Sequence, residues 1–203
     1  MGNQHKASAK LRLEIAQIAA KFVAVDGIND YLTAKRKAAL HIGASPDGNL
    51  PTNSEVEEAL KNYQNLFQGM SQKKMLYSLR KKSLKAMRFL DKYNPRLVGP
   101  VLSGTATRFT EITLHLFSDE PEQIGFYLDE HGIPFTSCEK TIRFNINEKN
   151  SLPAYRFVAD DDIILLIIFS EKHKNLVPLS SITNRPMQRA SLSKVESLLR
   201  DPV

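Results

Sequence analysis

The dipeptide Asn94-Pro95 separates two parts of the chain with different hydrophobic patterns, and this change constrains the fold more than any other feature. Before it, apolar residues recur every three or four positions, the spacing of amphipathic helices. After it, they alternate with polar residues or form short runs, as strands do. The residue before a proline resists the helical conformation, so the last helix should end here. The sequence therefore predicts a helical, basic region over residues 1–93 and an α+β domain over residues 94–203.

Four helices are expected in the first part, over residues 7–25, 30–40, 54–67 and 71–92. Ser54 and Glu57 have the spacing of a capping box, in which each side chain satisfies a free backbone N–H at the start of the third helix. A loop of turn-forming residues, GASPDGNLPTN, precedes this helix.

The hydrophobic pattern of the second part predicts a mixed β-sheet with flanking helices. A helix is expected from Ser118 to His131, and a final helix is expected to be capped by Ser191 or Ser193. The continuous apolar run Ile163–Phe169 predicts a central strand buried on both faces. The expected strands are Arg96–Leu102, Ile112–Phe117, Ile133–Phe135, Lys140–Ile146, Ala154–Ala159 and Ile163–Phe169.

Charge is distributed unevenly between the two parts. Residues 1–100 hold 17 Lys and Arg against 8 Asp and Glu, a net charge of +9, whereas residues 101–203 carry −3. Five cations lie along one face of the fourth expected helix, where like charges repel. A nucleic-acid surface would explain this arrangement, and salt bridges to the acidic second part are the alternative. The five are Lys74, Lys81, Lys85, Arg88 and Lys92.

Composition excludes several classes of protein. Cys138 is the single cysteine, so the chain has no internal disulfide framework and no zinc site built from several cysteines. No stretch approaches 18 consecutive apolar residues, so no membrane-spanning helix and no membrane partner are expected. The first residues lack the apolar core of a signal peptide. These features favour a cytoplasmic protein.

The stretch GPVLSGTATRFTEITLHLF, residues 99–117, places a glycine-rich turn before a strand that carries one carboxylate, Glu111. This order resembles the signature of the nucleotidyltransferase superfamily, which includes DNA polymerase beta, kanamycin nucleotidyltransferase and small bacterial nucleotidyltransferase domains. Val98-Gly99-Pro100 matches the apolar-Gly-Ser position, and Leu102–Thr105 matches the turn that follows. Glu111-Ile112-Thr113 matches an acidic-apolar-acidic triplet. The resemblance covers about residues 96–169, and it implies that Arg96–Leu102, Ile112–Phe117 and Ile163–Phe169 are neighbours in one sheet.

The resemblance also implies roles for individual residues. Glu111 would be the catalytic and metal-binding carboxylate, with Asp162 as a second metal ligand and magnesium or manganese as the ion. Hard oxygen ligands suit these ions, and two of them clamp the attacking and leaving oxygens of a phosphoryl group. A nucleotide would contact the turn and the polar face of the strand, at Gly99, Ser103, Gly104, Thr105, Thr113 and His115.

The chain departs from the family pattern at three positions. Pro100 replaces the phosphate-binding Ser, Thr113 replaces the second acid, and Ile163–Phe169 contains no acid. We therefore expect a degenerate nucleotidyltransferase-like protein that binds a nucleotide or nucleic acid, with weak or absent transfer activity. Two alternatives remain open from the sequence: an active metal-dependent nucleotidyltransferase with altered carboxylates, or a non-catalytic module that binds an acidic protein partner.

Overall fold

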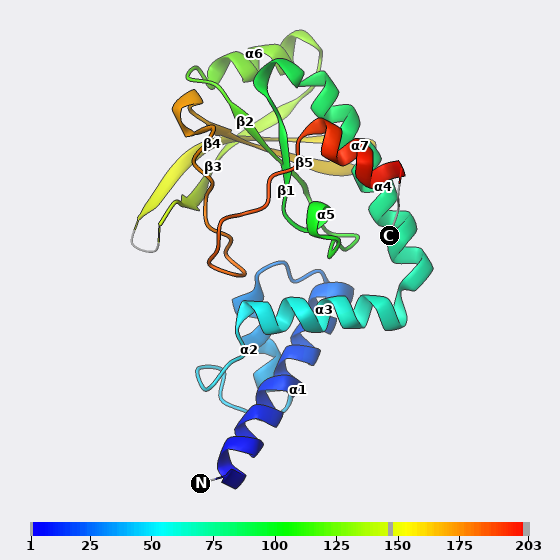
Figure 1. The fold of residues 1–203 in the computed structure, drawn as a ribbon, viewed down its shortest axis with the longest axis vertical. Coiled ribbons are helices and arrows are strands. Elements are labelled where there is room, and N and C mark those ends of the chain that lie inside the picture. The colour runs from blue at the N-terminus through cyan, green and yellow to red at the C-terminus, as the bar shows by residue number, and fades with distance from the viewer. Residues whose placement is uncertain (1, 146–147, 201–203) are drawn as a thin grey trace. The chain divides into compact units, whose positions relative to one another are not determined.

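The protein has the α+β fold that the sequence predicts, with helices at the N-terminus and a five-stranded mixed sheet after them (Figure 1). The structure is a computed structural model and describes residues 2–145 and 148–200. The chain forms two compact units. The first consists of the residues up to Met75 together with Thr107–Phe109 and Ser181–Thr183, and the rest forms the second. The units divide between Met75 and Leu76, whereas the sequence analysis placed the division between residues 93 and 94.

The first unit is built on three packed helices, α1 (Gly2–Asp26), α2 (Tyr31–His41) and α3 (Asn53–Phe67), and includes the beginning of α4 (Gly69–Phe89). Small residues let the helices approach closely, since Ala19 and Ala20 of α1 and Ala34, Ala38 and Ala39 of α2 have no exposed surface. Val56 and Leu60 of α3 complete this core.

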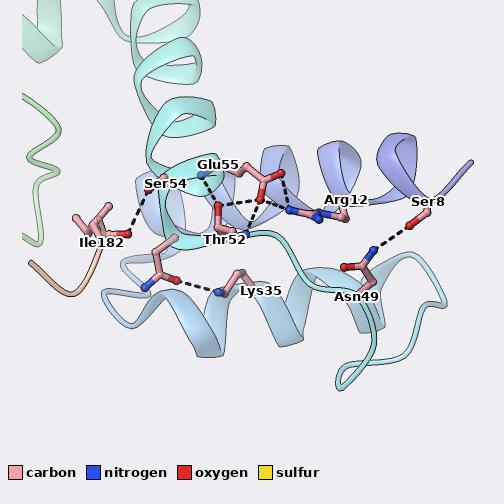
Figure 2. A network of polar contacts seen from close by, with 9 residues as sticks. Ser8, Arg12, Lys35, Asn49, Thr52, Ser54, Glu55 and Ile182 are labelled. Carbon is pink, nitrogen blue, oxygen red and sulfur yellow. Dashed lines mark hydrogen bonds and ion pairs between the residues drawn. The ribbon is translucent and has the colours of Figure 1, made fainter. Parts of the chain in front are cut away.

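The start of α3 is held by a polar network around Glu55 (Figure 2). The Thr52 backbone N–H donates to the Glu55 carboxylate at 2.6 Å, and the Glu55 N–H donates to the Thr52 hydroxyl at 3.2 Å. Arg12 of α1 donates to both Glu55 oxygens, at 2.9 and 2.7 Å. The capping box is therefore Thr52–Glu55, and the prediction of Ser54 and Glu57 is wrong. Glu57 turns inward instead, where the Tyr31 hydroxyl donates to it.

Two segments from the later part of the chain belong to the first unit. Asn53 and Ser54 donate to the backbone carbonyls of Ser181 and Ile182, at 2.7 and 3.2 Å. Phe109 packs on the turn after α1, where a Cβ on Gly27 would lie 2.7 Å from its ring. The first unit is therefore completed by residues far away in the sequence.

The second unit is a sheet with the strand order β1-β2-β5-β4-β3. β1 is antiparallel to β2, β2 is parallel to β5, and β5, β4 and β3 follow as antiparallel neighbours. The strands are β1 (Arg96–Val98), β2 (Ile112–Phe117), β3 (Phe135–Arg143), β4 (Lys149–Ala159) and β5 (Asp162–Phe169). The helices that join and cover them are α5 (Pro100–Ser103), α6 (Glu122–Glu130) and α7 (Leu192–Arg200), besides the greater part of α4.

Several strand bounds differ from the prediction. The first strand ends at Val98, because Gly99 turns the chain into α5. One strand, β3, replaces the two expected over 133–135 and 140–146, of which Ile146 lies outside the described residues. β4 begins ten residues before Ala159, earlier than expected, and its Pro153 pairs with Glu139 of the edge strand β3. The final helix follows Ser191, whose hydroxyl accepts the Lys194 N–H at 3.4 Å.

One face of the sheet is apolar throughout its centre. Ile112, Leu114 and Leu116 of β2 have no exposed surface, and Ile164, Leu166 and Ile168 of β5 are buried beside them. α6 covers part of this face, because a Cβ on its Gly125 would lie 3.1 Å from the Phe135 ring. As predicted, β5 is buried on both faces from Ile164 to Phe169, whereas Ile163 is exposed.

The opposite face carries the polar residues of β2, and we call it the His115 face. Directly paired residues of neighbouring strands share a face, so the register assigns its members. They are Arg96 and Val98 of β1, Thr113, His115 and Phe117 of β2, Leu165, Ile167 and Phe169 of β5, and Ala154 and Arg156 of β4. Within residues 2–145 and 148–200, no helix is long and apolar enough to cross a bilayer.

The Thr52 cap gives a stability prediction. Thr52→Ala removes the hydroxyl that accepts the Glu55 N–H, and loss of such a cap costs about 1 kcal/mol. The free energy of unfolding, measured by urea denaturation followed by circular dichroism, should fall by that amount. Asn62→Ala, at an exposed position of the same helix, is the control and should not lower it. An unchanged value in Thr52→Ala would show that the cap contributes nothing.

Candidate ligand site

The predicted nucleotide-binding turn leaves β1 at Gly99 and continues through a single helical turn, α5. Gly99 has a φ of 73° and Gly104 has a φ of 91°, conformations that L side chains rarely adopt. Between them, the Ser103 hydroxyl is exposed and lies 3.0 Å from the Thr105 hydroxyl, which is buried. The turn therefore depends on glycine at two positions, and Ser103 is its exposed hydroxyl-bearing residue.

The register brings this turn beside the polar start of β2. Val98, the residue before Gly99, pairs with Thr113, which is half-buried on the His115 face. Glu111 lies directly before β2 and two residues before Thr113, so the two side chains lie on the same face. The structure thus brings Gly99, Glu111 and Thr113 to one end of the His115 face.

Glu111 forms an ion pair with Arg156 of β4. The Arg156 Nη2 atom lies 3.0 Å from Glu111 Oε1 and 3.4 Å from Oε2. The register explains the contact, because Arg156 pairs with Leu165 of β5, which in turn pairs with Thr113 of β2. Sequence reasoning missed Arg156. Its position between the inward-facing Tyr155 and Phe157 was a signal that it points to the other face.

Asp162 lies on the opposite face and has another partner. Its carboxylate accepts a hydrogen bond from Lys82 of α4, which also donates to the Asp160 carbonyl at 2.7 Å. Asp160 and Asp161 have φ values of 48° and 69° and form the tight turn between β4 and β5. The two predicted metal ligands, Glu111 and Asp162, are therefore not brought together. In the described part of the chain, no three His, Cys, Asp or Glu side chains are grouped as a metal site would require.

His115 is fully buried at the centre of its face. The Nε–H group of Arg189, from the segment before α7, donates to His115 Nδ1 at 3.1 Å. Because Nδ1 accepts, the proton of the neutral ring is on Nε2. Burial, with the nearby Arg189 charge, lowers the pKa of His115 to about 3. His115 is thus a neutral hydrogen-bonding group at neutral pH, and it is not accessible as the surface contact that the sequence predicted.

Arg189 extends over the aromatic rings of the His115 face. Its guanidinium carbon lies 4.8 Å from the Phe169 ring centroid and 5.2 Å from that of Phe117. Its Nη1 donates to the carbonyls of Lys174 and Leu176, each at 3.2 Å. Burial and repulsion from Arg96 lower the pKa of Arg189 to about 10. The sequence analysis assigned Arg189 no role.

Unpartnered donors gather on this face. Among the described residues, five buried side-chain nitrogen or oxygen atoms have no hydrogen-bond partner. Three of them are nitrogens of the His115 face or of the arginine above it: His115 Nε2, Arg156 Nε and Arg189 Nη2. A buried donor without an acceptor is costly, so these three nitrogens are unfavourably placed polar atoms of this face.

The predicted nucleic-acid surface on α4 is largely engaged by other groups. Lys85 lies 3.7 Å from Asp160 and Arg88 lies 2.7 Å from Glu196 of α7. The Lys92 ammonium lies over the Tyr127 ring, 3.5 Å from its centroid. Lys81 is exposed in the second unit, and Lys74 is exposed in the part of α4 that belongs to the first unit. Acidic groups of the second unit therefore pair with two of the five cations, Lys85 and Arg88.

Comparisons with known proteins add no relative: no family model matches the chain, and neither curated proteins nor solved structures give a significant match. The nucleotidyltransferase resemblance therefore stays a prediction that rests on the residues quoted above. The three segments that it places together, β1, β2 and β5, are neighbours in the sheet.

The buried His115 gives a pH prediction. Its ordinary pKa of about 6.5 applies in the unfolded chain, whereas the folded value is about 3. As pH falls below about 6.5, the unfolded state binds the proton first, so this residue's contribution to stability is full above that pH and is lost below it. Between about pH 7.5 and pH 5.5, the loss should be roughly 1 kcal/mol.

His115→Gln should lack this part of the pH dependence, because glutamine does not titrate. The measurement is the free energy of unfolding of both proteins at the two pH values. Equal pH dependence in the two proteins would contradict the assignment of His115 as a buried neutral ring.

Proposed function

We propose that the second unit binds a nucleotide or the phosphate groups of a nucleic acid, and that it is a degenerate nucleotidyltransferase-like protein with weak or absent transfer activity. The ligand would lie at the end of the His115 face that carries Thr113 and Arg156, next to the turn at Gly99. We propose a cytoplasmic location, which the single free cysteine, Cys138, suits.

The observation that carries the proposal is the pairing of Glu111 with Arg156. Two-metal transfer needs several carboxylates that converge on the ions. Here Glu111 is held by a guanidinium, Thr113 is uncharged, and Asp162 is held by Lys82 on the other face. These residues do not fit a pair of magnesium or manganese ions, so we derive no transfer step through a metal.

Arg156 supplies the chemistry that the proposal needs. A guanidinium presents several N–H donors in one plane and binds phosphate oxygens through two of them at once. Its side chain is 42% exposed, and its Nε atom has no hydrogen-bond partner. A phosphate group placed against Arg156 would replace Glu111 as its anion, with the Thr113 hydroxyl as a further donor.

Substitution of the ion pair distinguishes this proposal from metal-dependent catalysis. Arg156→Gln should weaken binding of ATP at least tenfold, because a charge-assisted hydrogen bond contributes about 1.5–3 kcal/mol. Glu111→Gln should leave ATP binding equal or tighter, since it removes the competing carboxylate. Isothermal titration with ATP, in the presence of magnesium and of a chelator, measures both effects.

Lys172→Gln, at an exposed position of the same unit, is the control and should bind like the unmodified protein. Metal-dependent nucleotidyl transfer that is lost in Glu111→Gln would overturn the proposal in favour of the active enzyme.

If the ligand is a nucleic acid, the positively charged side chains of α4 should contribute to its binding. The triple variant Lys81→Glu, Lys85→Glu, Arg88→Glu should reduce the affinity for a single-stranded RNA or DNA and flatten its dependence on salt, because fewer counterions are released. Fluorescence anisotropy over a range of salt concentrations measures both. Binding that is unchanged in affinity and salt dependence would exclude α4 from the interface and leave the nucleotide as the ligand.

A further inference from the structure

The first unit contains a cavity that the proposed function does not use. Its volume is about 380 Å³, which lies within the usual range of small-molecule sites. Its walls come from three parts of the chain: the end of α1, the beginning of α4 with the preceding Gln68, and the segment that carries Thr107 and Arg108. All of these residues belong to the first unit, so the cavity is formed within that unit.

Three contacts hold the segment with Arg108 against the end of α1. Arg108 Nη2 donates to the Val25 carbonyl at 3.4 Å, and the Asn29 side-chain amide donates to the Phe109 carbonyl at 3.5 Å. The Phe109 ring covers Gly27, whose φ is 72° and where a Cβ would lie 2.7 Å from the ring. This wall of the cavity therefore depends on glycine at position 27, because a larger residue would push the ring away.

The cavity combines an apolar wall with a single charge. Ala24 and Val25 line it from α1, and Met75 adds a flexible apolar side chain from α4. Ala24 is 5% exposed, whereas Arg108 is exposed and lies at the rim. Among the described residues that line the cavity, Arg108 alone is charged. The complementary ligand is therefore an anion with an apolar portion.

Arg108 has donors that the protein does not use. Within the described residues, its guanidinium has no carboxylate partner. Its contacts are the Val25 carbonyl and the Phe109 ring, whose centroid lies 4.6 Å from the guanidinium carbon. A guanidinium carries several N–H donors, so most of them are open to a ligand. The half-buried Gln68 side chain on the cavity wall likewise has no hydrogen-bond partner in the described chain.

We propose that this cavity binds a small organic anion, which consists of an apolar chain and one carboxylate or phosphate group. The anionic group pairs with Arg108 at the rim, and the apolar chain lies against Ala24, Val25 and Met75. A guanidinium binds either group through two parallel hydrogen bonds, and the Gln68 amide is a further donor. A cation is excluded as the occupant, because the one charge at the cavity is positive.

This inference does not depend on the proposed function. Thr113 and Arg156 belong to the second unit, whereas every residue named for the cavity belongs to the first. The cavity requires neither a nucleotide nor any kinship with the nucleotidyltransferases. It needs only the packing of Phe109 on Gly27 and the position of Arg108 at the rim.

The test is titration of the full chain with hexanoate and, separately, with hexyl phosphate, followed by calorimetry and by the methyl NMR signal of Met75. We expect saturable binding of one molecule that moves this signal, and the tighter of the two compounds identifies the anionic group. Hexanamide has the same chain without the charge, and it should bind at least tenfold more weakly, because it lacks the charge-assisted hydrogen bonds. Acetate has the charge without the chain and should also bind at least tenfold more weakly than hexanoate.

Two variants assign the binding to the cavity. Arg108→Gln should weaken binding of the anion at least tenfold, so that it no longer binds better than hexanamide. Arg36→Gln is the matched control, because it removes another exposed arginine of the same unit, which pairs with Asp47. Ser71→Phe places a ring at an exposed position of the cavity wall and should abolish binding. Circular dichroism checks that both variants are folded, as the exposure of Arg108 and Ser71 leads us to expect.

Three results would overturn the inference. They are the absence of saturable binding by both anions at millimolar concentration, equal affinity for the anion and hexanamide, and unchanged anion binding in Arg108→Gln. The test is also distinct from that of the proposed function. If hexanoate or hexyl phosphate binds as stated and ATP does not bind, the proposed function is wrong and this inference stands. If ATP binds and neither anion does, this inference alone is wrong.

Discussion

The parallel pairing of β2 with β5 decides which side chains of the second unit share a face. Its register sets Thr113 against Leu165 and His115 against Ile167, and the β4–β5 hairpin then sets Arg156 beside Leu165. A shift of one residue in either pairing would move every side chain of the strand to the other face. The register thus places Glu111 beside Arg156 on the His115 face and Asp162 beside Lys82 on the opposite face. Each carboxylate is held in an ion pair, and neither is available to a common metal site.

Guanidinium groups occupy the face where the family resemblance implies carboxylates. Arg156 lies at one end, and Arg96 and Arg189 lie beside the neutral, buried His115. In the described residues, three of the four buried donor atoms without a hydrogen-bond partner belong to these residues. Such a surface attracts acceptor oxygens and repels metal cations, which is why we derive phosphate binding from it and no two-metal chemistry.

The apolar pattern of the sequence was enough for the fold class, because helical and strand periodicities are local. Ile163–Phe169 indicated a central strand without any knowledge of its neighbours, and β5 is that strand. The capping box was misplaced by two residues, because Ser54 and Thr52 both have a glutamate three positions later. Only tertiary contacts, from Arg12 to Glu55 and from Tyr31 to Glu57, decide between them.

The candidate site was harder to predict from the sequence, because it depends on contacts between residues far apart in the chain. The turn at Gly99 and the alternation of Glu111, Thr113 and His115 are local features, and the structure has both. Arg156 and Arg189 lie 45 and 74 residues from their partners, so no local pattern connects them. Arg156 could be assigned to the site only once the strand order was known, and Arg189 only once the path of the chain before α7 was known.

The most direct test of the account is a crystal structure of the full chain grown with ATP and manganese, with anomalous data collected at the manganese edge. The account predicts phosphate oxygens in contact with Arg156 and no anomalous peak at the Glu111 carboxylate. A manganese ion bound to Glu111 and to the nucleotide would contradict it.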